Sequence, residues 1–349
     1  MLKKVDHIGI IVKDVEKAAI TFAESFGFKL IDKMDTQDGE YQSIMMVCGE
    51  IKLEIIQPLK KSGIATSLQE NGPGLHHISL ITDDILAEMK NVREHGQTLR
   101  LPKAVQFYGF QLAFIRPEGM DNVKIELVEN KPRQLEEMGS FFDARIEGYE
   151  THMIGNANDA DTYSETAKLI PAKKNLKLLD LGCGTGLELD EIFKVNPTVR
   201  VTGIDLAEKM LERLELKHPD KKNQLNLIQA DYFKYDFGKN VYDVAVSYSS
   251  LHHFTPEEKI GLYRKTYACL KPDGFYLEDD YMAPTQEYED YHFAENKRIR
   301  AELGIKEGYY HYDTPCTVEN QIAMLKKAGF KSVEIAGKYG IDVALVARK

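Results

Sequence analysis

The chain of 349 residues has few cysteines, and the four it has are scattered at Cys48, Cys183, Cys269 and Cys316. None forms a C-x-x-C pair, and their spacing matches no disulfide framework. The sequence therefore gives no support for a disulfide-stapled secreted fold, and its cysteine usage is typical of a reduced, cytoplasmic protein.

Long apolar runs are also missing. The longest uninterrupted ones, such as residues 8–12 and 343–347, are far shorter than the roughly 20 residues that a membrane-spanning helix needs. The first residues show neither the apolar core nor the small-residue cleavage site of a secretory signal. We therefore expect neither secretion nor a membrane partner.

An excess of basic residues is absent as well. The chain has 45 Lys and Arg against 55 Asp and Glu, a formal net charge of −10. A nucleic-acid interface usually needs a strongly basic face, so this balance argues against a nucleic-acid partner. Small molecules are the better candidate ligands.

The length predicts two domains, at about 100–200 residues per domain, and the first domain contains an internal repeat. Residues 5–12 resemble residues 75–82, and the alignment places His7 on His77. A helix-like stretch follows each copy. The repeat predicts a duplicated unit of strand, helix and further strands.

The ends of the two copies match too. Residues 52–57 (Lys-Leu-Glu-Ile-Ile-Gln) resemble residues 124–129 (Lys-Ile-Glu-Leu-Val-Glu), which places Glu54 against Glu126. Charged residues among aliphatic ones inside a strand are costly to bury without a partner.

After residue 130 the pattern changes to alternating strands and helices. Strands are predicted at 176–181, 199–204, 225–229, 242–247, 274–278, 332–335 and 342–347, and helices at 187–195, 207–217, 257–270 and 318–328. This alternation predicts a mostly parallel sheet with helices on both faces. We expect domains at 1–130 and 140–349, joined by a linker at 131–139.

The strongest local signal of the second domain is a strand that runs into a turn with three glycines and then a helix, Leu178-Leu-Asp-Leu-Gly-Cys-Gly-Thr-Gly-Leu187. Glycines let a backbone approach a ligand closely, and a helix N-terminus favours a carboxylate or phosphate. A dinucleotide fingerprint would have its third glycine at position 187, which is leucine here. This disfavours NAD and leaves open another doubly wound fold with a glycine-rich turn.

Acidic residues follow the next two strands. Asp205 ends one of them, where it can accept both hydroxyls of a ribose, and Asp231 follows the other. Together with the glycine turn and Leu-Lys-Pro-Asp-Gly at 270–274, they resemble class I S-adenosylmethionine-dependent methyltransferases. The resemblance covers residues 140–349 and implies a doubly wound, Rossmann-like α/β domain.

The resemblance implies cofactor-binding roles for ten residues. Asp180, Gly182, Gly184 and Gly186 would line the methionine moiety, Asp205 would hold the ribose, Leu206 and Met210 would lie against the adenine, Asp231 would meet its amino group with Tyr232 nearby, and Ser247 would sit at the methyl-donor pocket. The segment 141–149 resembles the helical lead-in that covers the cofactor in many such enzymes.

Methyl transfer needs a base only if the acceptor must lose a proton. We take His252 as the candidate, with His253, Asp279 and Asp280 as alternatives after the fourth and fifth strands. The two histidines could instead cap the next helix. The tyrosine- and histidine-rich stretch 281–312 would suit a lid over the acceptor, or simply core packing.

Two histidines and two glutamates at equivalent positions of a duplicated unit suit a divalent cation. The candidate ligands are His7, Glu54, His77 and Glu126, and the candidate metals are Ni, Co, Mn, Fe and Zn. The alternative is a set of packed, hydrogen-bonded core residues.

Residues 3–130 resemble the vicinal oxygen chelate superfamily, specifically glyoxalase I and methylmalonyl-CoA epimerase. The resemblance is carried by Asp-His-Ile-Gly-Ile-Ile-Val at 6–12, Leu-Glu-Ile-Ile-Gln-Pro at 53–58 and Gly-Leu-His-His-Ile at 74–78. It implies an α+β fold of paired βαβββ units whose cleft holds a metal on the four ligands.

In that family a chelated carbonyl stabilises an enediolate after proton loss, and Glu54 or Glu126 would be the catalytic base. Two segments depart from the family pattern: 36–39 lacks the acidic residue of epimerases at its expected place, Gln37, and 105–110 differs around the acyl group.

The sequence thus predicts a cytoplasmic bifunctional enzyme: a methyltransferase for a small organic acceptor, fused to a metal-dependent lyase or isomerase. Two alternatives stay open. The N-terminal half could be a non-catalytic ligand-binding or dimerisation module, and the chain could form a homodimer. Two histidines and one glutamate could also form the iron site of a dioxygenase.

Overall fold

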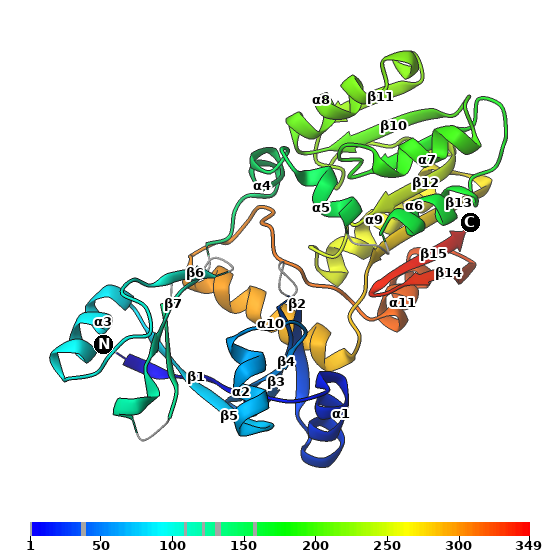
Figure 1. The fold of residues 1–349 in the computed structure, drawn as a ribbon. Helices are drawn as coiled ribbons and strands as arrows, with labels where there is room; N and C mark the ends of the chain where they lie inside the picture. The colour runs from blue at the N-terminus through cyan, green and yellow to red at the C-terminus, as the bar shows by residue number, and fades with distance from the viewer. Residues whose placement is uncertain (1, 36–39, 108–109, 121–122, 130–133, 156–158) are drawn as a thin grey trace. The chain divides into compact units, whose positions relative to one another are not determined.

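The computed structural model of the chain describes residues 2–35, 40–107, 110–120, 123–129, 134–155 and 159–349. The chain forms two compact units, Met1–Gln134 and Leu135–Lys349 (Figure 1). Of the predicted linker, residues 131–133 lie outside the described ranges, and α4 (Met138–Ala144) begins before the linker ends. Within the described ranges, no helix is long and apolar enough to cross a membrane.

The first unit is built on one eight-stranded sheet, in the order β2-β3-β4-β1-β5-β8-β7-β6. Its strands are β1 (Leu2–Ile11), β2 (Lys29–Asp35), β3 (Tyr41–Cys48), β4 (Ile51–Pro58), β5 (Gly74–Thr82), β6 (Val105–Phe107), β7 (Phe110–Ile115) and β8 (Ile125–Glu129). Within each half the first strand pairs in parallel with the last, β1 with β4 and β5 with β8, and β1 meets β5 antiparallel in the middle. These are the predicted paired βαβββ units.

Helices α1 (Val15–Phe26) and α3 (Ile85–Glu94) pack on one face of this sheet. The buried residues beneath α1 include Ile44 and Ile55, and those beneath α3 include Leu127. Successive strand residues point to opposite faces, so the residues next to these in the strands face the other side. A further helix, α2 (Gly63–Asn71), was not predicted from the sequence; it is short and has no buried residue.

The second unit has a seven-stranded sheet in the order β11-β10-β9-β12-β13-β15-β14. The strands are β9 (Lys177–Leu181), β10 (Arg200–Asp205), β11 (Leu225–Gln229), β12 (Tyr242–Tyr248), β13 (Leu270–Tyr281), β14 (Ser332–Tyr339) and β15 (Asp342–Arg348). The first five pair in parallel, and β15 is antiparallel to both its neighbours. The order reverses between β9 and β12, where open α/β sheets bind ligands.

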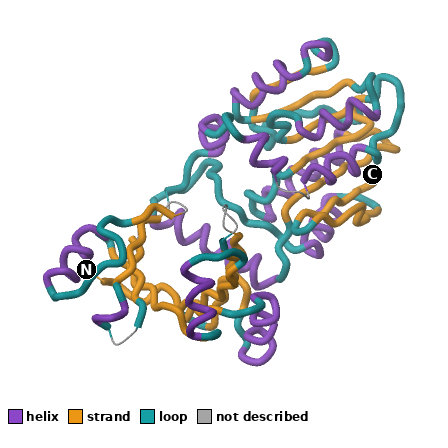
Figure 2. Tube along the Cα trace, in the orientation of Figure 1, coloured by secondary structure: helices purple, strands orange, loops and turns teal. Residues whose placement is uncertain are grey.

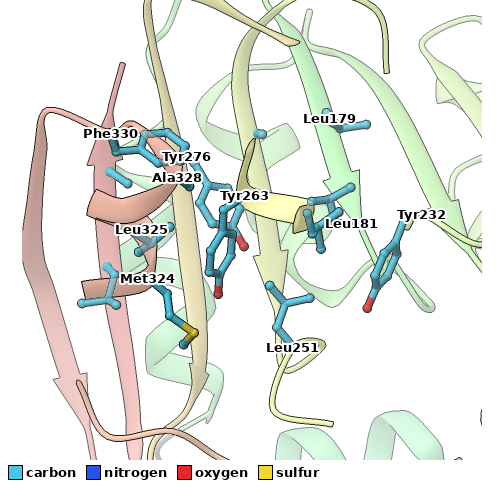
Figure 3. Close-up of a cluster of buried hydrophobic side chains, with 14 of the residues drawn as sticks. Leu179, Leu181, Tyr232, Leu251, Tyr263, Tyr276, Met324, Leu325, Ala328 and Phe330 are labelled. Atoms are coloured by element: carbon cyan, nitrogen blue, oxygen red, sulfur yellow. The ribbon is translucent and has the colours of Figure 1, made fainter. Parts of the chain in front are cut away.

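Helices cover both faces of this sheet, and strand and helix alternate along the trace (Figure 2). Helices α6 (Asp159–Ala167), α7 (Leu187–Val195) and α8 (Glu208–Lys217) contribute to one apolar core, and α9 (Pro256–Cys269) and α11 (Val318–Ala328) to the other. In the second core Tyr263 of α9 and Leu325 of α11 pack near Tyr276 of β13 (Figure 3). The predicted fold class is confirmed for both halves.

The tyrosine-rich stretch holds a helix that the sequence did not predict, α10 (Gln286–Glu302). Thr285 caps it, because its side chain accepts a hydrogen bond from the Tyr288 backbone N–H. Few of its residues are buried, so its apolar pattern is weak. Lead-in helices α4 and α5 (Tyr149–Gly155) precede the sheet.

Two glycines of the second unit allow a matched test of how tightly the glycine turn after β9 packs against α8. Gly186 has φ 70° and an added Cβ would lie 2.4 Å from Leu214 Cδ1, whereas Gly261 in α9 has open space around it. We expect Gly186→Ala to lower the free energy of unfolding by about 2–4 kcal/mol, from left-handed strain plus overpacking. Gly261→Ala should raise it by about 0.5–1 kcal/mol, through helix propensity.

The measurement is urea denaturation of the full chain followed by circular dichroism, because the chain has no tryptophan to report fluorescence. Equal effects of the two substitutions would contradict the tight contact between the glycine turn and α8.

Candidate functional site

Four side chains of the first unit converge on the sheet face opposite α1 and α3. His7 Nε2 and His77 Nε2 lie 3.0 Å apart, and Glu54 Oε2 lies 3.4 Å from His7 Nε2 and 3.7 Å from His77 Nε2. Glu126 Oε2 lies 3.7 Å from both nitrogens. The structure therefore brings together all four predicted metal ligands, from β1, β4, β5 and β8.

The spacing of these four atoms fits a bound cation. Ligand atoms about 2.1 Å from one metal ion lie about 3.0–3.4 Å from each other in octahedral or tetrahedral geometry. His7, His77 and Glu126 are also buried, and two imidazole nitrogens 3.0 Å apart need a proton or a cation between them. Two nitrogens and two carboxylates suit the divalent metals Zn, Ni, Co, Mn and Fe.

The ionisation of the metal-free cluster agrees with this reading. Burial opposes protonation of His7, but hydrogen bonds with Asp6 and Glu54 outweigh it and raise the pKa of His7 to about 10. Burial lowers the pKa of His77 to about 4 and raises the pKa of Glu126 to about 7. In the absence of a metal, the His7 imidazole is therefore protonated and positively charged. A bound metal cation would take the place of that proton.

Outer groups fix the two imidazoles. His7 Nδ1 lies 2.9 Å from Asp6 Oδ2, and His77 Nδ1 lies 3.0 Å from His76 Nδ1. Such partners hold the ring nitrogen that faces away from a metal and so orient the ligating one. Gly9 lies beside His77 across the strand pair, and an added Cβ would stand 2.2 Å from His77 Cε1.

The two segments that depart from the family pattern give no further guidance. Residues 36–39, which include Gln37, lie outside the described ranges, and so do residues 108 and 109 of the segment 105–110.

The second unit has a cleft at the carboxyl ends of β9, β10 and β12. It lies where open α/β sheets commonly bind ligands. The lining residues are Met138, Gly139, Phe142, Tyr149, Gly182, Gly184, Asp205, Leu206, Met210, Tyr232, Tyr248, Ser249, Ser250, His253 and Phe254. We call this space the donor cleft.

The glycine turn and Asp205 form one hydrogen-bonded wall of the donor cleft. The Gly184 N–H donates to Asp205 Oδ2 and the Ala207 N–H donates to Oδ1, both at 2.8 Å. Gly184 has φ 48° and its nearest neighbour, the Tyr149 hydroxyl, would be 3.8 Å from an added Cβ. This stretch of backbone is therefore open to a ligand, and the adjacent carboxylate has lone pairs left for hydroxyl donors.

Acidic groups lie behind the turn. Asp180 is fully buried, and its carboxyl group lies beside that of Glu188, with which it interacts. Burial, reinforced by Glu188 and Asp205, raises the pKa of Asp180 well above its ordinary value. The donor cleft itself has no Lys or Arg in its described lining. A positively charged ligand, such as the sulfonium and ammonium of S-adenosylmethionine, fits this environment.

Six of the ten predicted cofactor residues line the donor cleft, namely Gly182, Gly184, Asp205, Leu206, Met210 and Tyr232. Four do not. Asp180 lies behind the turn, Gly186 packs against Leu214 of α8, and Asp231 accepts a hydrogen bond from the Phe233 N–H and pairs with Lys234.

Ser247 is the fourth, and it does not line the donor cleft. Its side chain is fully buried and its hydroxyl lies 2.6 Å from the Tyr276 hydroxyl, inside the core. The cleft is lined instead by the next three residues, 248–250, because the chain leaves β12 there. Ser249 has φ 44°, a conformation that is uncommon for a residue other than glycine and often marks a functional turn.

The two histidine candidates for the acceptor base lie at different places. His253 lines the donor cleft, whereas His252 lies beside it, with Nδ1 2.5 Å from Asp280 Oδ1. His311, which belongs to the stretch expected to form a lid, and Asp313, which sequence reasoning missed, approach these histidines with their side chains. No local pattern could have found Asp313, because it lies about 60 residues further along the chain.

Comparison with known proteins finds a different family for each half of the chain. Residues 6–114 match the Glyoxalase/Bleomycin resistance protein/Dioxygenase superfamily, and residues 178–274 match the methyltransferase domain family.

Three similar proteins illustrate the match. The carboxy-S-adenosyl-L-methionine synthase of Helicobacter hepaticus is 26% identical over 227 residues, 61% of this chain and 92% of that protein. The uncharacterized protein YqjC of Bacillus subtilis is 28% identical over 136 residues, 38% of this chain and 96% of that protein. The structure of methylmalonyl-CoA epimerase from Mycobacterium tuberculosis is 26% identical, with a TM-score of 0.36, and the match covers 38% of this chain and 91% of that one.

The chain is therefore a fusion of two enzyme-type domains. Its N-terminal half is a domain of the glyoxalase, or vicinal oxygen chelate, superfamily, and its C-terminal half is an S-adenosylmethionine-dependent methyltransferase domain. Both resemblances seen in the sequence are confirmed.

Proposed function

We propose that the protein transfers the methyl group of S-adenosylmethionine to a small organic acceptor. The observation that carries the proposal is the donor cleft, where the open backbone at Gly184 adjoins the Asp205 carboxylate. Asp205 would hold the ribose hydroxyls, and Leu206 and Met210, which line the same wall, would pack on the adenine.

The sulfonium of the cofactor supplies an already activated methyl group. The protein's own residues then have to hold the acceptor in line with the S–C bond and exclude water. Phe142 and Tyr149 of the lead-in helices line the cleft and are suited to covering the cofactor.

Some relatives are carboxy-S-adenosyl-L-methionine synthases, which raises the question of which cofactor this chain uses. A carboxylate on the transferred carbon would need a cationic partner in the site. The described lining has no Lys or Arg, and burial lowers the pKa of His253, which leaves it neutral. These features favour the unmodified cofactor.

The group of His252, His253, His311 and Asp313 adjoins the donor cleft through His253, and we propose that it binds and activates the acceptor. Asp280 is a positioning residue, since its carboxylate holds His252 Nδ1 while its Oδ2 accepts the Leu251 N–H.

The test combines binding and turnover. Calorimetry should show S-adenosylhomocysteine binding at one site per chain, and mass spectrometry of small molecules carried by the purified protein should find no carboxylated cofactor. Incubation with labelled S-adenosylmethionine and a panel of phenols, amines, thiols and carboxylic acids should transfer label to one class. Absence of S-adenosylhomocysteine binding would refute the proposal, and a bound carboxylated cofactor would refute our choice of donor.

We also propose that the first unit binds a divalent metal and acts as a lyase or isomerase. The convergence of His7, Glu54, His77 and Glu126 favours this second activity. When bound, the metal would polarise a substrate carbonyl, and Glu54 or Glu126 would take up the proton lost from the adjacent carbon. The alternative of a non-catalytic module predicts metal binding without proton exchange.

A further inference from the structure

Four side chains meet beside the donor cleft. Asp313 Oδ1 lies 3.1 Å from His253 Nδ1, 3.7 Å from His252 Nε2 and 3.9 Å from His311 Nε2. Three imidazole nitrogens of different residues thus surround one carboxylate oxygen. We call these four residues the histidine cluster.

The closest pair of the cluster joins two segments that are far apart in the chain. His253 Nδ1 and Asp313 Oδ1 are both buried atoms, and they lie 3.1 Å apart as a histidine–carboxylate pair. Removing such polar atoms from water costs about 1–3 kcal/mol unless they find partners. A cation bound between the imidazoles and the carboxylate would be a partner for all of them.

The atoms are close enough to share one ion. The ligand atoms of His252, His253 and Asp313 all lie within 4.8 Å of one another, as do those of the predicted ligands His7, His77 and Glu126 in the first unit. Ligands of a tetrahedral zinc site are about 3.4 Å apart, so a modest inward shift would complete coordination.

The surroundings hold the cluster in place. The Asp280 carboxylate accepts from His252 Nδ1, which leaves Nε2 facing Asp313, and metal-bound histidines commonly have such a carboxylate on their outer nitrogen. Asp6 stands in the same relation to His7. His311 is stacked on Phe141, with ring centroids 3.5 Å apart and planes at 8°.

The backbone ties the two segments of the cluster together. The Thr314 N–H donates to the His252 carbonyl at 2.6 Å, and the Thr314 hydroxyl donates to the same oxygen at 3.2 Å. Residues that are about 60 positions apart in the sequence are therefore fixed next to each other before any ligand binds. Such pre-organisation is what a metal site needs.

We infer that the histidine cluster is a second divalent-metal site, with His252, His253 and Asp313 as ligands, His311 as the candidate fourth, and an open position that the acceptor would fill. Nitrogen-rich ligation of this kind suits Zn, Co, Mn or Fe. The role in catalysis rests on the proposed methyltransferase function; the metal site itself does not.

The metal would act on an acceptor that carries a hydroxyl group. A hydroxyl bound to a divalent cation loses its proton more readily, and that proton passes to solvent. The acceptor oxygen then forms the new O–CH₃ bond with its lone pair while the S–CH₃ bond breaks and its electron pair returns to sulfur. The products are the methyl ether and S-adenosylhomocysteine, so no oxidant or reductant is needed.

The test is elemental analysis of the full chain, purified without chelator and reconstituted with Zn²⁺ or Co²⁺. We expect about two equivalents of metal in the wild type and about one each in His77→Ala and Asp313→Asn, since each site loses a ligand. Asp273→Asn, at an exposed aspartate near the start of β13, is the control and should keep both equivalents. In the His77→Ala background, the Co²⁺ visible absorption should vanish when Asp313→Asn is added.

Two outcomes would overturn the inference: no metal in His77→Ala after reconstitution, or an unchanged metal count in Asp313→Asn. A shifted pH profile of methyl transfer in Asp313→Asn without any metal would identify the histidine cluster as an acid–base group instead. If S-adenosylhomocysteine fails to bind the wild type while two metals are found, the proposed methyltransferase function fails and the second metal site stands.

Discussion

Replacing Asp205 with alanine should weaken S-adenosylhomocysteine binding by about 100-fold or more, the largest effect that we expect in the second unit. Two hydrogen bonds from ribose hydroxyls to a carboxylate contribute about 1.5–3 kcal/mol each, and every 1.4 kcal/mol is a factor of ten. The same carboxylate also accepts the Gly184 and Ala207 N–H groups, so its loss would loosen the glycine turn as well.

The measurement is calorimetric titration with S-adenosylhomocysteine. Asp205→Asn separates the two contributions, because the amide oxygen still accepts one backbone hydrogen bond while the charge is lost. Glu208→Gln is the matched control, since Glu208 is an exposed acidic residue in the first turn of α8. Equal affinities of the wild type and Asp205→Ala would contradict the assignment of this wall of the donor cleft to the ribose.

In the first unit, His77→Ala should lower metal affinity by at least about 100-fold, because even outer partners of a metal ligand are worth 10–100-fold. Gly9→Ala should act in the same direction without removing a ligand, since the new methyl group would displace the His77 imidazole. His95→Ala is the control: this histidine is exposed at the end of α3.

Activity of the first unit is tested by solvent deuterium exchange at the carbon next to the carbonyl of thioesters and hydroxyketones. We expect exchange in the metal-loaded wild type and none in His77→Ala. Glu126→Gln and Glu54→Gln, each measured at saturating metal, would show which carboxylate takes the proton. Full metal occupancy with no exchange on any substrate would leave the first unit as a binding module.

The two folds were predictable because their signals are local or repeated. Helices 187–195 and 318–328 and strand 225–229 have the bounds expected from hydrophobic periodicity. The internal repeat pairs His7 with His77 and Glu54 with Glu126 through sequence similarity alone. Helix α10 was missed because it buries few residues and so shows little periodicity.

The sequence by itself determined which residue types stand at the ends of the strands and in the repeated unit, and hence both domain families and the four candidate ligands of the first unit. Only the tertiary structure decided which side chains reach a site. Ser247 points into the core, whereas residues 248–250 line the donor cleft. Side chains alternate between the two faces of a strand, so the residue at which β12 ends determines which side chains reach the cleft. Asp313 joins His252 and His253 because a long connection folds back, which is a non-local contact that periodicity does not encode.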